Sequence, residues 1–81
     1  MSTNLLRKFS KMLYMKVFAN RLRELRIEKC LSMKQLAKAI DTTDAAISNW
    51  ENCINEPKIS YLVKLAMFFN VSTDYLLGLE N

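Results

Sequence analysis

The chain has 81 residues, 51% of them hydrophobic, which is enough for one compact core and too few for two. Its 12 Lys and Arg against 8 Asp and Glu give a net charge of +4, which favours polyanionic partners. With two Cys and no His, it lacks the four ligands of a structural zinc site. No apolar run approaches the roughly 20 residues of a membrane span, so we expect a cytoplasmic protein with reduced thiols and no membrane partner.

The N-terminal extension, residues 1–16, has apolar residues at helical spacing on one side and basic residues on the other. Two interpretations remain open: an amphipathic helix that dimerises, packs on the domain or lies along DNA or lipid, or a disordered leader. The apolar residues are Leu5, Leu6, Phe9, Met12 and Leu13, and the basic ones are Arg7, Lys8 and Lys11.

Residues 17–81 read as one all-helical domain of five short helices, because strand patterns are nearly absent. Ser32 followed by Gln35 predicts a capping box at the start of a second helix, and Thr43 is a suitable N-cap for a third. The expected helices are about Phe18–Lys29, one after Ser32, one after Thr43, about Ile59–Phe69, and one after Ser72. Their predicted core includes Phe18, Leu22, Leu25, Leu62, Leu65, Ala66 and Phe69.

The segment from Ser32 to Glu51 predicts two short helices joined by a tight turn at Asp41-Thr42-Thr43. A helix pair crossing near a right angle can place its second helix in the major groove of DNA. The inward residues are Leu36, Ala37 and Ile40 on the first helix and Ile47 and Trp50 on the second. The outward face of the second helix carries Asn49, whose amide can bond adenine through two hydrogen bonds.

This helix pair, with its flanking segments, resembles the Cro/C1 class of helix-turn-helix regulators, which includes the lambdoid phage repressors. The resemblance covers about four-fifths of the chain. Its motifs are Phe18-Ala-Asn-Arg-Leu-Arg-Glu-Leu-Arg26, Leu31-Ser32, Trp50-Glu51-Asn52, Pro57, Leu62, Leu65-Ala66 and Asn70-Val71-Ser72-Thr73-Asp74-Tyr75-Leu76-Leu77-Gly78.

The resemblance implies a compact five-helix lambda-repressor-like DNA-binding domain. The N-terminal extension lies outside the resemblance, and an extra helix there is one of its two open interpretations. It implies a sequence-specific regulator of double-stranded DNA, a repressor, whose third helix (about 44–51) reads the major groove. It also implies an ion pair between Arg26 and Glu51. The expected base contacts are Asp44, Ala45, Ala46 and Asn49, and the expected phosphate contacts are Ser32, Lys34, Lys38, Thr43, Asn55 and Lys58.

The chain departs from the family pattern at several positions. Met33 stands where Gln commonly holds a phosphate, and Asp41 and Cys53 stand where Gly is common. Asp44 has two equally supported roles, accepting a hydrogen bond from cytosine or stabilising the N-terminus of its own helix. Residues 15–81 carry nine basic and eight acidic residues, so any DNA affinity must come from local placement of charge.

A single reading helix covers few base pairs, so we expect a homodimer on a pseudo-palindromic operator in the nucleoid. The dimer surface is either the last helix with Leu77-Gly78-Leu79 or the N-terminal helix. The alternative function is a protein-interaction module of the same fold, resembling an antirepressor or antitoxin. Nothing indicates an enzyme, a cofactor or a metal, because there is no His, no paired nucleophile and no phosphate-binding Gly loop.

Overall fold

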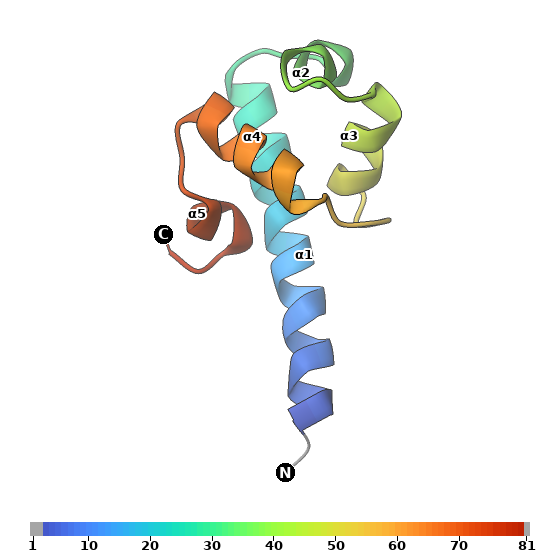
Figure 1. Ribbon diagram of the computed structural model, residues 1–81, viewed down its shortest axis with the longest axis vertical. Helices are drawn as coiled ribbons and strands as arrows, with labels where there is room; N and C mark the ends of the chain where they lie inside the picture. Colours follow the sequence, from blue (N-terminus) through green and yellow to red (C-terminus); the bar gives the residue numbers. More distant parts are fainter. Residues whose placement is uncertain (1–2, 81) are drawn as a thin grey trace.

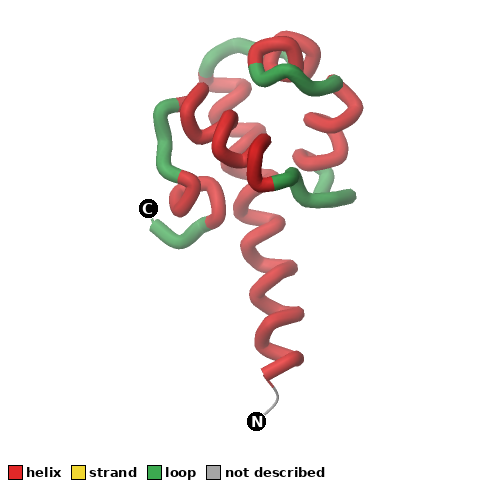
Figure 2. Tube along the Cα trace, in the orientation of Figure 1, coloured by secondary structure: helices red, strands yellow, loops and turns green. Residues whose placement is uncertain are grey.

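The computed structural model describes the backbone of residues 3–80 and the side chains of residues 11–80. These residues form five α-helices and the loops between them, with no strand in the described part (Figure 2). The expected all-helical, five-helix class is therefore confirmed. The helices are α1 (Thr3–Glu28), α2 (Met33–Ala39), α3 (Asp44–Glu51), α4 (Ile59–Phe69) and α5 (Thr73–Leu77).

Helix α1 is much longer than the sequence predicted, because it begins at Thr3 rather than near Phe18. Residues 3–16 belong to this helix without a break, and α1 projects well beyond the other four helices (Figure 1). No Gly or Pro lies between Thr3 and Glu28, so nothing in this stretch stops a helix once it has formed. The projection makes the molecule 45 Å long against 25 and 20 Å in the other directions.

The amphipathic pattern predicted for the extension falls largely on side chains outside the described part: Leu5, Leu6, Arg7, Lys8 and Phe9. Among the described residues, Met12 and Leu13 are 59% and 58% exposed, and Met12 borders a small hollow with Cys53 at the end of α3. No described helix is long and apolar enough to cross a bilayer.

The core takes one fully buried side chain from each helix, namely Leu22, Leu36, Ile47, Leu65 and Leu76, all 0% exposed. A core shared in this way holds all five helices in one packing unit. Two predicted core residues lie at its edge instead: Leu25 and Leu62 are only partly buried, packed against the central cluster.

Helix boundaries follow from the caps that the sequence predicted. Ser32 Oγ accepts a hydrogen bond from Gln35 N at 3.0 Å, and Gln35 Oε1 accepts one from Ser32 N at 2.8 Å, which completes the capping box. Thr43 and Ser72 cap α3 and α5 in the same way through one hydroxyl each. These bonds satisfy amides that a helix start otherwise leaves unpaired.

Helix α5 is held against α1 by contacts that bring the end of the chain back to its first helix (Figure 1). The Arg21 guanidinium donates to the carbonyl oxygens of Tyr75 and Glu80 and lies 4.2 Å from the centre of the Tyr75 ring. Gly78 has a φ of 80°, and a Cβ there would lie 2.8 Å from Val17. Only glycine fits this close approach.

Four non-glycine residues in the described part of the chain adopt the left-handed conformation, among them Cys53 at the end of α3. Its φ is 59°, its N–H donates to Trp50 O, and the next N–H, from Ile54, donates to Asn49 O. This is the Schellman ending for which glycine is preferred, because a left-handed Cβ is strained.

We expect Cys53→Gly to raise the stability by about 0.5–1 kcal/mol, or the melting temperature by about 2–8 °C. Asn70→Gly is the matched control, because Asn70 has a φ of 56° but Asn tolerates this region. Thermal unfolding followed by circular dichroism measures both changes. A Cys53→Gly gain no larger than that of Asn70→Gly would show that Cys53 is unstrained.

Candidate nucleic-acid interface

The turn between α2 and α3 sets the angle of the helix pair. Asp41 has a φ of 61°, the left-handed region that favours glycine. The Thr42 N–H donates to Ala37 O at 2.8 Å, so the chain reverses directly after α2. Thr43 then caps α3 through a 3.1 Å bond from Ala46 N to its hydroxyl. The predicted helix–turn–helix geometry rests on this left-handed residue and this cap.

Two shallow hollows flank the N-terminal end of α3, and together they contain most of the predicted contact residues. The first lies between α2 and the start of α3, and Lys34, Lys38, Thr43 and Asp44 line it. The second lies between α3 and the loop that precedes α4. Its lining residues are Thr42, Thr43, Ala45, Ala46, Asn49, Trp50, Asn55, Glu56, Lys58 and Tyr61.

The four predicted base-contacting residues differ in how accessible they are. Asp44 and Ala45 are exposed, whereas Ala46 is half-buried and packs against the core. Ala46 therefore has less surface to offer than the sequence suggested. Asn49 is half-buried at the wall of the second hollow, and its side-chain amide makes no hydrogen bond within the described residues. Its two donors and one acceptor are free for a ligand.

The Asp44 carboxylate lies at the start of its own helix. Its Oδ1 accepts a hydrogen bond from Ala45 N at 3.1 Å, an arrangement that favours a negative charge at the helix N-terminus. Of the two roles expected for Asp44, the structure thus contains the contact within the helix. The side chain is also exposed beside Lys34 and Lys38 in the first hollow.

The predicted phosphate-contacting residues surround the exposed end of α3. Lys34, Lys38 and Lys58 are exposed, and none of them forms an ion pair within the described part of the chain. The hydroxyl oxygens of Ser32 and Thr43 each accept a capping bond, which leaves each hydroxyl hydrogen free to donate. Asn55 lies in the second hollow, and Ser32 is the one predicted residue that lines neither hollow.

The Arg26 and Glu51 side chains meet at the far end of α3. Arg26 Nε lies 2.7 Å from Glu51 Oε2, and Arg26 Nη2 lies 3.0 Å from Glu51 Oε1. The Glu51 side chain is fully buried, and its hydrogen bonds hold the pKa of Arg26 above its ordinary value. Arg26 also donates to Leu31 O at 2.9 Å, so one guanidinium joins α1, the α1–α2 loop and α3.

Sequence reasoning missed two residues of this region. Arg23 Nε lies 3.4 Å from Glu51 Oε1. Arg23 could have been predicted as a second partner of Glu51, because it lies one turn before Arg26 on the same helix face. Tyr61 lines the second hollow, with its ring centre 5.6 Å from that of Trp50. No local sequence pattern predicts the position of Tyr61, because Tyr61 reaches the second hollow only when α4 packs beside α3.

Comparison with known proteins gives a helix-turn-helix family model that matches residues 22–76. The chain is 38% identical over 65 residues to the uncharacterized HTH-type transcriptional regulator YobD of Bacillus subtilis (strain 168), covering 80% of this chain and 58% of that protein. It is 38% identical over 58 residues to the HTH-type transcriptional regulator ImmR of the same organism, covering 72% and 46%. It is also 36% identical over 63 residues to the HTH-type transcriptional activator BcrR of Enterococcus faecalis, covering 78% and 31%.

The chain therefore spans about half of the length of the first two relatives and a third of the third. Among solved structures, the P22 c2 repressor in complex with synthetic operator 9T superposes with a TM-score of 0.72 at 32% identity. That match covers 74% of this chain and 91% of the repressor chain. This chain belongs to the Cro/C1-type helix-turn-helix family and has the lambda-repressor-like fold.

Proposed function

We propose that this protein is a sequence-specific regulator of transcription that binds double-stranded operator DNA and reads the major groove with α3. The observation that carries the proposal is the convergence of polar and basic side chains on the N-terminal half of α3, from both flanking hollows. A relative of the same fold, the P22 c2 repressor, was solved in complex with a synthetic operator. A helix N-terminus surrounded by lysines suits a phosphate backbone.

In this proposal Asn49 and Ala45 meet base edges, Asp44 accepts from cytosine N4 or stays on its own helix, and Ala46 contributes at most a methyl contact. The phosphate contacts come from Lys34 and Lys38 on one side of α3, from Asn55 and Lys58 on the other, and from the hydroxyls of Ser32 and Thr43. The ion pair of Arg26 with Glu51 fixes how α3 is presented.

The finer features follow from the same placement. In this proposal the bound domain represses transcription by occlusion of the promoter. A homodimer on a pseudo-palindrome supplies the base pairs that one α3 cannot cover. Such a protein works at the nucleoid in the cytoplasm. It performs no reaction and needs no cofactor or metal.

Salt dependence tests the proposal without knowledge of the operator. Binding of the protein to random duplex DNA, measured by fluorescence anisotropy between about 50 and 200 mM salt, should weaken steeply because counterions are released. Lys58→Ala should reduce the magnitude of the slope of log affinity against log salt concentration by about 1 for each phosphate contact that is lost. It should weaken binding to all duplexes by a similar factor.

Lys16→Ala is the matched control, since Lys16 is an exposed lysine on α1 that lines neither hollow beside α3. It should leave both the slope and the affinity nearly unchanged. Absence of duplex binding at low salt would contradict the proposal and favour the alternative, a protein-interaction module resembling an antirepressor or antitoxin. Equal effects of Lys58→Ala and Lys16→Ala would mean that DNA binds elsewhere.

A further inference from the structure

Three sulfur-containing residues line one small hollow between α1 and the end of α3. The hollow has a volume of about 130 Å³, and its lining residues are Met12, Met15, Lys16 and Cys53. It shares no lining residue with the two hollows that flank the start of α3, so it is separate from the candidate DNA-binding surface. Its volume is sufficient for one metal ion and a few solvent molecules.

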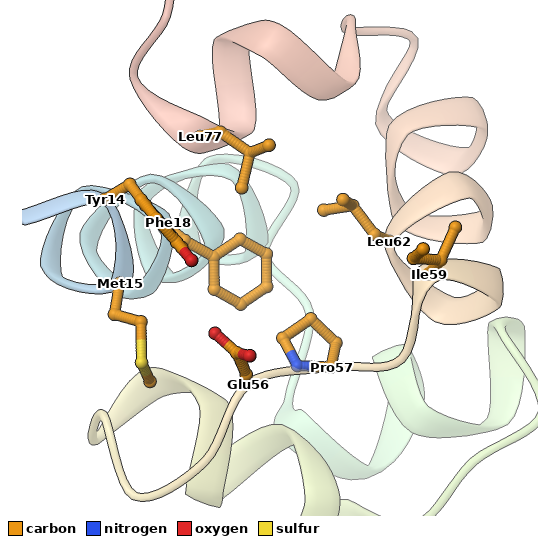
Figure 3. Close-up of a pocket in the computed structure, with 8 residues that line it drawn as sticks. All are labelled: Tyr14, Met15, Phe18, Glu56, Pro57, Ile59, Leu62 and Leu77. Atoms are coloured by element: carbon orange, nitrogen blue, oxygen red, sulfur yellow. The ribbon is translucent and has the colours of Figure 1, made fainter. Parts of the chain in front are cut away.

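The packing of α3 on α1 brings the thiol to the two methionines. Met12 and Met15 are three residues apart on α1, so they lie on neighbouring turns of one helix face. Cys53 follows α3 with a φ of 59°, and its Sγ lies 3.8 Å from Met15 O, although the two residues are 38 positions apart in the sequence. Figure 3 shows the Met15 side chain extending from α1 towards the end of α3.

The sulfur ligands of this cluster can be reached from solvent. Cys53 is an exposed free thiol, Met12 is 59% exposed, and Met15 is half-buried. Within the described residues, the one polar contact of the thiol is its weak S–H donation to Met15 O. A metal ion that enters the hollow therefore has only this weak contact to displace.

The chemistry of these ligands selects a soft ion. Thiolate and thioether sulfurs favour Cu(I), whereas Mg²⁺ and Ca²⁺ take oxygen ligands and zinc sites usually combine several thiolates and imidazoles. Among the described residues, the lining includes no carboxylate. The charge of Lys16 acts in the same direction, because Cu(I) with one thiolate is neutral, whereas Zn²⁺ with one thiolate keeps a positive charge beside the Lys16 ammonium.

We propose that Met12, Met15 and Cys53 form a binding site for Cu(I). Binding forms one bond from the ion to the Cys53 thiolate and one to each thioether, and the thiol proton passes to solvent. The oxidation state of the ion does not change. The bound ion joins α1 to the residue that follows the reading helix, close to the Arg26–Glu51 pair. It is an added ligand, and the proposed DNA binding does not require it.

Competition with a chromogenic Cu(I) chelator tests the site under anaerobic, reducing conditions. The unchanged chain should remove one equivalent of Cu(I) from the chelator. Cys53→Ser should weaken this binding by at least about 100-fold, because even groups outside the first ligand shell are worth 10–100-fold. Met12→Leu and Met15→Leu should each weaken it by at least about 10-fold, since leucine keeps the volume of the side chain but removes the sulfur.

The chain offers a matched control for each kind of ligand. Cys30 is the other exposed free thiol, also left-handed with a φ of 57°, and it does not line this hollow. Met67 on α4 is 76% exposed and does not line it either. Cys30→Ser and Met67→Leu should both leave Cu(I) binding unchanged. A loss in Cys30→Ser equal to that in Cys53→Ser, no loss in Cys53→Ser, or equally tight binding of Zn²⁺ would overturn the proposal.

Thermal unfolding separates a site built by the fold from a thiol that acts alone. Saturating Cu(I) should raise the melting temperature of the unchanged chain, because the three sulfurs meet only in the folded state. A lone thiol binds the unfolded chain equally well and gives no rise. X-ray absorption at the copper edge should show three sulfur neighbours, and fewer than three, or an unchanged melting temperature, would contradict the site. These measurements use no DNA, so their outcome is independent of the proposed function.

Discussion

Replacing Trp50 by alanine should remove much of the stability of the domain. Trp50 is 5% exposed in the central cluster, and its ring centre lies 5.6 Å from that of Tyr61 on α4. The substitution leaves a large cavity between α3 and α4 as well as losing the burial of the ring. We expect a cost of about 3–5 kcal/mol, against a total of about 5–15 kcal/mol for most native proteins.

Urea unfolding followed by circular dichroism at 222 nm measures this cost, and Trp50→Phe is the control. Phenylalanine keeps an aromatic ring against Tyr61 and should lose clearly less than alanine. A Trp50→Ala midpoint within experimental error of the unchanged chain would mean that α3 does not pack on the core as described. The helix register at the reading surface would then be wrong too.

Replacing Arg26 by methionine should have the second large effect, because it leaves a buried carboxylate without its main partner. The Glu51 side chain is fully buried and receives 2.7 and 3.0 Å bonds from Arg26, against 3.4 Å from Arg23. Breaking a buried pair by removing one partner typically costs about 3–5 kcal/mol. Methionine retains much of the apolar stem, so the loss reports mainly on the charge and its hydrogen bonds.

Arg23→Met is the matched control on the same helix and against the same carboxylate. The Arg23 side chain is 48% exposed, and its removal should cost less than about 1 kcal/mol. Thermal and urea unfolding of both variants measure the difference. Equal costs would show that the two arginines share Glu51 evenly, and that the short bonds of Arg26 carry no special weight.

The short helices were predictable because each carries its own boundary signals. Ser32 with Gln35, Thr43 and Ser72 each begin a helix by a local side-chain bond, and α4 has the predicted bounds. Such caps act over three residues and need no tertiary structure. The left-handed turn at Asp41 could be expected for the same reason, from its place between two capped helices.

A helix in residues 1–16 was one of two interpretations left open, but its fusion with the helix expected from Phe18 was not predicted, because no boundary signal separates the two. The sequence from Thr3 onwards contains ordinary helix formers, and the family resemblance alone suggested a start near Phe18. Contacts between elements that are distant in the sequence could not be predicted either. The contacts of Arg21 with Tyr75 and of Tyr61 with Trp50 both depend on how the five helices pack.

For the candidate interface, the sequence predicted which elements meet but not how far each side chain is exposed. The second helix of the predicted pair coincides with α3. Five of the predicted contact residues line one hollow, namely Thr43, Ala45, Asn49, Asn55 and Lys58. Ala46 packs against the core, because a small residue on the inner edge of α3 allows close approach to its neighbours. An outward position on a helical wheel does not separate exposed from half-buried residues.

The most direct measurement of the central claim is the affinity of Asn49→Ala for a selected operator. Duplexes enriched from random DNA by the unchanged protein supply that operator, and fluorescence anisotropy at fixed salt gives the affinities. Asn49 lines the hollow beside α3 with an amide that bonds no described residue, and it can pair with adenine N6 and N7. We predict a loss of about 1–3 kcal/mol on the operator, far less on random duplex, and a melting temperature nearly unchanged. Operator affinity that is indifferent to substitution of Asn49, Asp44 and Ala45 together would contradict α3 as the reading helix.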